Sequence, residues 1–180
     1  MRRHPTAFIL ILLAATVRLS AATRGFWLNV PYVHQVKDGC GAAAISMVMR
    51  YWERQFRIPL SPAANPAHIL RALYSSRARG IYAASMVGYF RENGYQTYAF
   101  RGTRQALSHH LSKGRPLIIA LGPRHGLRPL HYVVVAGMDS AENVVIVNDP
   151  ARRKLRKMDW PGIKKRWRAT GNWTLLVLPQ

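Results

Sequence analysis

The sequence contains one cysteine and few acidic residues, and each scarcity narrows what the protein can be. Because Cys40 is the only cysteine among 180 residues, no disulfide can form within the chain and the thiol needs another explanation. Asp and Glu together number 7 against 27 Lys and Arg, so the formal net charge is +20. Internal repeats and low-complexity tracts are also missing. With 49% hydrophobic residues and five tryptophans, the composition is that of a globular protein rather than a disordered tail.

The sequence has no apolar run long enough to span a membrane comfortably. A short apolar run near the N-terminus predicts an export signal. Residues 2–4 form a basic start, residues 7–17 an apolar core too short for a comfortable membrane span, and residues 20–22 a small-residue cleavage site. No cysteine follows, which argues against a lipoprotein anchor. We therefore expect residues 1–22 to be a cleaved signal peptide, with a retained membrane anchor as the alternative. Residues 23–180 are then expected to form one exported domain, periplasmic or secreted.

The excess of basic residues predicts attraction to polyanions. An exported protein rarely meets nucleic acid, so anionic lipid headgroups, lipopolysaccharide or wall polymers are the partners expected for a basic face. The alternative is that the arginine content reflects the general codon usage of the source. Basic clusters such as 152–154 and 164–166 are more often solvated surfaces than binding sites. We expect a monomer.

Hydrophobic periodicity and turn residues predict helices followed by an antiparallel sheet, which is an α+β layout. The expected helices are 41–51, 67–74, 81–93, 103–112 and 159–167. An extended segment is expected at 26–33, and the expected strands are 96–100, 116–121, 130–137, 144–148, 152–158 and 173–178. The turn residues at 140–143 indicate that the two strands around them form an antiparallel hairpin.

Cys40 lies where a turn meets the first of these helices. Backbone N–H groups and the helix dipole favour a thiolate over a thiol at a helix N-terminus. Gly39 and Gly41 flank the cysteine and would let a substrate backbone approach it. The favoured interpretation is a catalytic nucleophile, and the alternative is a small residue buried in the core.

Thiolate chemistry needs a base and a third group that orients the base. His131 begins one strand of the predicted hairpin and Asp149 ends the other, so the carboxylate can reach the imidazole. Taken singly, His131 is as well explained as a surface histidine and Asp149 as the turn former of an Asp-Pro pair. Their combination with Cys40 favours a catalytic triad.

Gln35 lies five residues before Cys40 and is the candidate for an oxyanion hole. Its side-chain amide could act together with the backbone N–H of Cys40. The alternative is a solvated loop glutamine, and the adjacent His34 is a weaker candidate for the same role.

A metal site is not expected. His109 and His110 are adjacent on a predicted helix and face different ways, which leaves them poorly placed to bind one ion together with His125 and His131. No cofactor is expected either.

Three segments carry a resemblance to a known family: VPYVHQVKDGCGAAAISMVMRYW, HYVVVAGMD and VVIVNDPA. The chain resembles the C39-type cysteine peptidases over roughly residues 30–178. The best-known members process double-glycine leader peptides of bacteriocins and are usually fused to an ABC transporter. The resemblance implies a papain-like fold in which the nucleophile begins a helix that packs on an antiparallel sheet.

The same resemblance assigns roles to four residues: Cys40 as nucleophile, His131 as general base, Asp149 as orienting acid and Gln35 as oxyanion donor. The family commonly has Asp directly before the cysteine, whereas Gly39 stands there in this chain. The family glutamine is also often one residue further upstream. No transporter segment follows in this sequence, so a separate transporter is considered as a partner.

The resulting hypothesis is an exported papain-like cysteine peptidase that cleaves a peptide or protein. Two alternatives stay open. One is a wall-peptide amidase or transpeptidase on the same scaffold, which the basic surface would suit. The other is a peptide-binding module that kept the fold and lost turnover.

Overall fold

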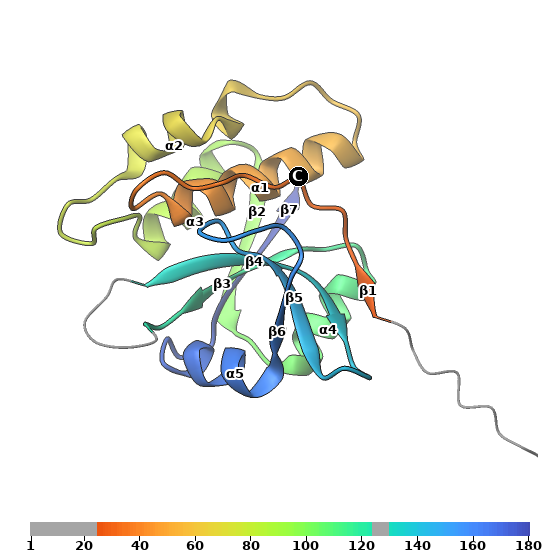
Figure 1. Ribbon diagram of the computed structural model, residues 1–180. Helices are drawn as coiled ribbons and strands as arrows, with labels where there is room; N and C mark the ends of the chain where they lie inside the picture. Colours follow the sequence, from red (N-terminus) through yellow and green to blue (C-terminus); the bar gives the residue numbers. More distant parts are fainter. Residues whose placement is uncertain (1–24, 124–129) are drawn as a thin grey trace, which may run out of the picture.

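A twisted antiparallel sheet with helices on both faces organises the molecule (Figure 1). The computed structural model describes residues 25–123 and 130–180. The helices are α1 (Cys40–Gln55), α2 (Pro66–Leu73), α3 (Ala83–Glu92), α4 (Arg104–Ser112) and α5 (Trp160–Arg168), with a 3-10 turn η1 (Pro62–Ala64). The strands are β1 (Phe26–Trp27), β2 (Tyr95–Arg101), β3 (Leu117–Leu121), β4 (His131–Asp139), β5 (Val144–Asn148), β6 (Arg156–Asp159) and β7 (Trp173–Pro179). The α+β prediction is confirmed.

The sheet runs in the order β2-β7-β3-β4-β5-β6, and β1 pairs with the far end of β4. The predicted hairpin is β4–β5, with Val134 opposite Asn148 and a register shift between Val135 and Gly137. Because Val134 and Asn148 are paired, the first residues of β4 lie beside the last residues of β5. This register is what positions His131 near Asp149.

Both faces of the sheet are buried, which explains why its central strands are apolar without alternation. In β3, Ile118 and Ala120 face a core that α1 and α3 complete. Leu117, Ile119 and Leu121 of the same strand face a second core with α4 and α5. Figure 1 shows α1, α2 and α3 above the sheet and α4 and α5 below it.

Side chains cap the N-termini of α4 and α5. The Thr103 hydroxyl accepts a hydrogen bond from the backbone N–H of Ala106 at 3.0 Å. The Asp159 carboxylate accepts one from Gly162 at 2.7 Å. By contrast, α1 begins after Gly39, which offers no capping side chain. No side chain caps the N-terminus of α1, so the positive end of the helix dipole can act on a ligand or a thiolate there.

The basic segment 152–158 differs from its prediction as an edge strand, because β6 begins only at Arg156. The preceding residues form a closed loop. Asp149 donates from its backbone N–H to the carbonyl of Arg153 at 3.1 Å, and Leu155 donates to the Asn148 side chain at 2.9 Å. Leu155 adopts a positive φ of 49°. These bonds bend the chain where charge and spacing alone suggested continuous extension.

The predicted signal peptide, residues 1–22, lies outside the described residues, as does His125. Among residues 25–123 and 130–180, no helix is long and apolar enough to cross a membrane.

Candidate active site

Cys40 is the first residue of α1 and is largely buried, with 9% of its surface exposed. A tight turn delivers the chain to it: Asp38 has a φ of 57°, and the backbone N–H of Gly39 bonds to the carbonyl of Val36 at 3.0 Å. The Cys40 sulfur lies 3.9 Å from the carbonyl oxygen of Leu130. The thiol therefore sits against the residue that precedes β4.

The side chains of His131 and Asp149 are in contact where β4 begins and β5 ends. His131 is the first residue of β4, and Asp149 directly follows β5. The imidazole Nε2 lies 2.8 Å from Asp149 Oδ1. The Asp149 side chain is only 4% exposed, and that of His131 is 21% exposed. Because Asp149 takes Nε2, the other ring nitrogen, Nδ1, is left for Cys40.

His131 and Asp149 each stabilise the charged form of the other. Burial lowers the pKa of His131, but hydrogen bonds to Asp149 and to Cys40 outweigh it and raise the pKa to about 9. Burial raises the pKa of Asp149, but its hydrogen bonds to His131 and Arg156 outweigh this and lower the pKa to about 2. At neutral pH His131 is therefore an imidazolium and Asp149 a carboxylate.

Arg156 is a site residue that sequence reasoning missed. Its Nη1 lies 2.6 Å from Asp149 Oδ2, the carboxylate oxygen that does not face His131. The sequence shows only one arginine among many, seven residues beyond the acid. The contact between Asp149 and Arg156 depends on the fold of the loop that joins them, which the sequence alone does not indicate.

Gln35 lies on the segment that leads into Cys40, and this segment is fastened to the residues after β5. The Gln35 backbone N–H bonds to the carbonyl of Pro150 at 3.0 Å. The Tyr32 hydroxyl donates to the carbonyls of Asp149 and Pro150, at 3.2 and 3.3 Å. The Gln35 Oε1 atom is buried without a hydrogen-bond partner in the described part of the chain. An unpaired buried amide oxygen marks a side chain whose partners are incomplete.

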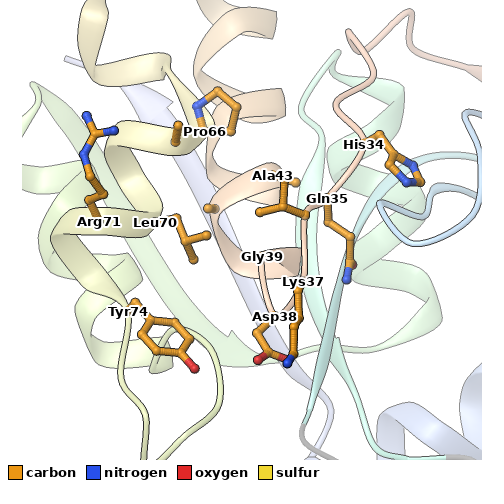
Figure 2. A pocket seen from close by; sticks show the side chains of 13 residues that line it. His34, Gln35, Lys37, Asp38, Gly39, Ala43, Pro66, Leu70, Arg71 and Tyr74 are labelled. Atoms are coloured by element: carbon orange, nitrogen blue, oxygen red, sulfur yellow. The ribbon is translucent and has the colours of Figure 1, made fainter.

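A pocket of about 890 Å³ adjoins this segment (Figure 2). Figure 2 shows it between the turn that contains Lys37 and Asp38 and the side chains of Leu70 and Tyr74 that come from α2 and its end. Its walls also include Ala42 and Ala43 of α1, Pro66 and Ala67 of α2, and the basic side chain of Arg71. The pocket thus combines an apolar wall with charged groups of both signs.

The two glycines beside Cys40 also have a packing explanation. A Cβ at Gly41 would lie 3.0 Å from the Cβ of Ile81, and one at Gly39 would lie 3.1 Å from the carbonyl oxygen of Val36. Both glycines are buried. They allow α1 and its turn to pack closely, and Gly39 also lines the pocket, so the approach of a substrate backbone stays a prediction.

In the described part of the chain, no group of three or more His, Cys, Asp or Glu is arranged to hold a metal ion. His109 is exposed, whereas His110 is partly buried and its ring lies 6.0 Å from that of Phe100. The rings of His109 and His110 lie 5.4 Å apart in edge contact, so the prediction that these two histidines face different ways is not confirmed.

With this geometry in view, comparison with known proteins decides the family. The model of the Peptidase_C39 like family matches residues 27–175. The chain belongs to this family. No curated protein matches the chain.

Several solved structures share the fold. The peptidase domain of Streptococcus ComA, a bi-functional ABC transporter of a quorum sensing pathway, has a TM-score of 0.63 at 22% identity, covering 83% of this chain and 98% of that one. A structure from Bacillus anthracis assigned as a C39-like peptidase has a TM-score of 0.65 at 14% identity, covering 84% and 96%. A double glycine motif protease from an AMS/PCAT transporter, in complex with the leader peptide, has a TM-score of 0.62 at 23% identity, covering 88% and 97%.

Family membership and fold support a peptidase function and confirm the papain-like α+β architecture. Cys40, His131 and Asp149 are brought together at one site, as the sequence led us to expect. Their catalytic roles, and that of Gln35, stay predictions.

The coupling of His131 to Asp149 predicts a measurable titration. The His131 imidazole should titrate with a pKa near 9 instead of the ordinary value of about 6.5. In Asp149→Asn the hydrogen-bonded charge is lost while burial and the contact with Cys40 remain, so the pKa should fall below that of wild type. Imidazole ¹⁵N NMR of both proteins measures this. An unchanged His131 titration in a folded Asp149→Asn protein would contradict the electrostatic assignment, and signals of the other histidines serve as internal controls.

Proposed function

We propose that this chain is a cysteine peptidase in which Cys40 attacks the scissile carbonyl of a peptide bond. The observation that carries the proposal is the 2.8 Å bond from His131 Nε2 to Asp149 Oδ1 at the N-terminal end of α1. This bond fixes the ring orientation and leaves Nδ1 for the thiol. A positioned base beside a nucleophile, held by a third group, is the arrangement that covalent catalysis requires.

The reaction follows from the charges at the site. The Cys40 thiolate forms a bond to the carbonyl carbon, and the carbonyl electron pair moves to the oxygen. When the tetrahedral intermediate collapses, the imidazolium of His131 gives its proton to the leaving amine and a thioester remains. Neutral His131 then takes a proton from water as that water attacks the thioester. The acid product leaves, and thiolate and imidazolium are restored.

Gln35 and the backbone N–H of Cys40 are the proposed donors to the oxyanion. The Gln35 backbone is anchored to Pro150, the residue that follows Asp149. The side-chain Nε2–H of Gln35 is the group that would donate to the oxyanion, and the backbone bond to Pro150 positions the segment that carries it.

A peptide is the proposed substrate. The pocket beside the turn into Cys40 presents Ala43, Leu70 and Tyr74, surfaces suited to apolar side chains of an extended or helical peptide. The structural neighbour determined in complex with the leader peptide supports a peptide ligand for this fold. Lys37 and Arg71 add positive charge to the pocket wall and Asp38 adds negative charge, which leaves a small positive excess that favours an acidic group on the peptide.

Export of the mature chain to the periplasm or the exterior is part of the proposal, and it rests on the pattern of residues 1–22. The basic surface would suit an anionic envelope component there. We do not require a metal or a cofactor for the proposed reaction.

Replacing the nucleophile gives the first test. Cys40→Ala should cleave a panel of fluorogenic peptides at no more than the background rate, because no other thiol can form the thioester. Its thermal unfolding should stay within a few degrees of wild type, since a small side chain replaces another small one. A folded Cys40→Ala protein with wild-type turnover would refute the mechanism. Turnover of purified peptidoglycan without turnover of any peptide would instead favour the wall-peptide amidase.

The oxyanion role of Gln35 gives a second test. Gln35→Ala should lower kcat by about 10²- to 10³-fold with little change in KM, as the loss of one oxyanion donor does. His34→Ala is the matched control, because it alters the adjacent residue on the same segment. Steady-state kinetics on one peptide substrate compare the two. If His34→Ala lowers kcat and Gln35→Ala does not, the assignment of the donor is wrong.

A further inference from the structure

The carboxylate of Asp149 is bound on both of its oxygens. Oδ1 faces His131 at 2.8 Å and also accepts the backbone N–H of Ala151 at 3.2 Å. Oδ2 faces Arg156 Nη1 at 2.6 Å. The Tyr32 hydroxyl contacts the backbone carbonyl of Asp149, not its carboxylate. In the described part of the chain, Arg156 is thus the one partner shown for Oδ2.

Burial makes this second partner important. The Asp149 side chain is 4% exposed, so water cannot satisfy Oδ2. A buried carboxylate is costly unless each oxygen has a donor, and a cation is the strongest such donor. The Arg156 side chain is 24% exposed, so its guanidinium keeps contact with solvent while one nitrogen reaches the acid.

The fold fixes Arg156 in this place. Arg156 opens β6 and pairs with Val147 of β5, two residues before the acid. The loop between Asp149 and Arg156 is closed by its own backbone bonds, from Asp149 N to Arg153 O and from Arg152 N to Asp149 O. The acid and the arginine therefore come from neighbouring strands joined by a short, ordered loop.

We propose that Arg156 is a positioning residue of the peptidase reaction, which holds the Asp149 carboxylate ionised and turned so that Oδ1 faces His131. The inference rests on the proposed function and extends it from three residues to four. The thiolate of Cys40, the imidazolium of His131, the carboxylate of Asp149 and the guanidinium of Arg156 form a row of alternating charges. Without Arg156 the row carries a net negative charge, and the carboxylate can turn away from the ring.

The groups that face Asp149 set the direction of the pH effect. They are His131 from β4, Arg156 from β6, the backbone of Ala151 in the loop and the phenol of Tyr32, whose pKa is raised by burial and by this carboxylate; Cys40 of α1 acts through His131. The hydrogen bond to Arg156 is one of the contacts that lower the pKa of Asp149. Its loss should raise this pKa, so that the carboxylate is protonated at a higher pH and the acidic limb of kcat/KM moves upward.

The test compares Arg156→Met and Arg156→Lys with Arg153→Met. Arg153 is exposed in the same loop, so its replacement removes the same charge without touching the carboxylate. We expect Arg156→Met to lower kcat on the order of 10- to 100-fold with KM nearly unchanged, the loss typical of a slightly misplaced catalytic group. Its acidic limb should move to higher pH. Arg156→Lys should restore the position of the limb and part of kcat, while Arg153→Met should behave as wild type.

Chemical rescue distinguishes a positioning role of Arg156 from a purely structural one, because added guanidinium can replace the missing group only in the first case. Guanidinium chloride at low, non-denaturing concentration should raise the activity of Arg156→Ala several-fold, and sodium chloride at equal ionic strength should not. A wild-type kcat and acidic limb in Arg156→Met would overturn the proposal. Equal losses in Arg153→Met would also overturn it, as would a lowered kcat with an unmoved limb and no rescue.

A titration of the Asp149 carboxyl by ¹³C NMR separates this proposal from the proposed function. The pKa should rise from about 2 in wild type when Arg156 becomes Met. If wild type cleaves no peptide, the peptidase function fails, but the carboxyl titration still tests the role of Arg156. An unchanged titration in folded Arg156→Met protein would overturn it. Arg156→Met/Asp149→Asn, which removes both charges, controls for a fold that needs the pair.

Discussion

The hydrogen bond between His131 and Asp149 is the interaction on which the site depends. It is nearly sealed from solvent on the acid side, so it persists only because the fold supplies every partner that the carboxylate needs. The register of β4 and β5 brings the two residues to one edge, and β6 brings Arg156 to the remaining oxygen. The thiol end of the row is set separately, by the start of α1. The site is therefore a junction between the helical layer and one edge of the sheet.

A second set of contacts links the acid to the oxyanion segment. Asn148, fully buried at the end of β5, donates to the Val30 carbonyl and accepts from Leu155, so it ties the N-terminal segment to the loop after Asp149. Tyr32 and the Gln35 backbone add bonds to residues 149 and 150. The parts of the site that orient the base and those that would bind the oxyanion share one hydrogen-bonded scaffold. A substitution in this scaffold is therefore expected to alter both the orientation of His131 and the position of the oxyanion donors.

Local signals in the sequence predicted those parts that local physics determines. The helix start at Cys40 and the β4–β5 hairpin each depend on neighbours in the chain, and both are present in the structure. Arg156 could not be predicted, because its contact requires a loop whose bend depends on the Asn148 side chain. The close packing of Gly41 could not be predicted either, because its neighbour Ile81 lies forty residues further along the chain. The pocket formed with α2 likewise depends on tertiary packing.

The central claim is that Cys40 and His131 form a reactive thiolate–imidazolium pair, and alkylation of the single cysteine tests it most directly. The rate of reaction with iodoacetamide would be followed against pH in wild type and in His131→Ala. Wild type should be alkylated much faster than His131→Ala at neutral pH, because the imidazolium that stabilises the reacting thiolate is missing in the variant. Identical pH profiles for the two proteins, with both folded, would contradict the pairing.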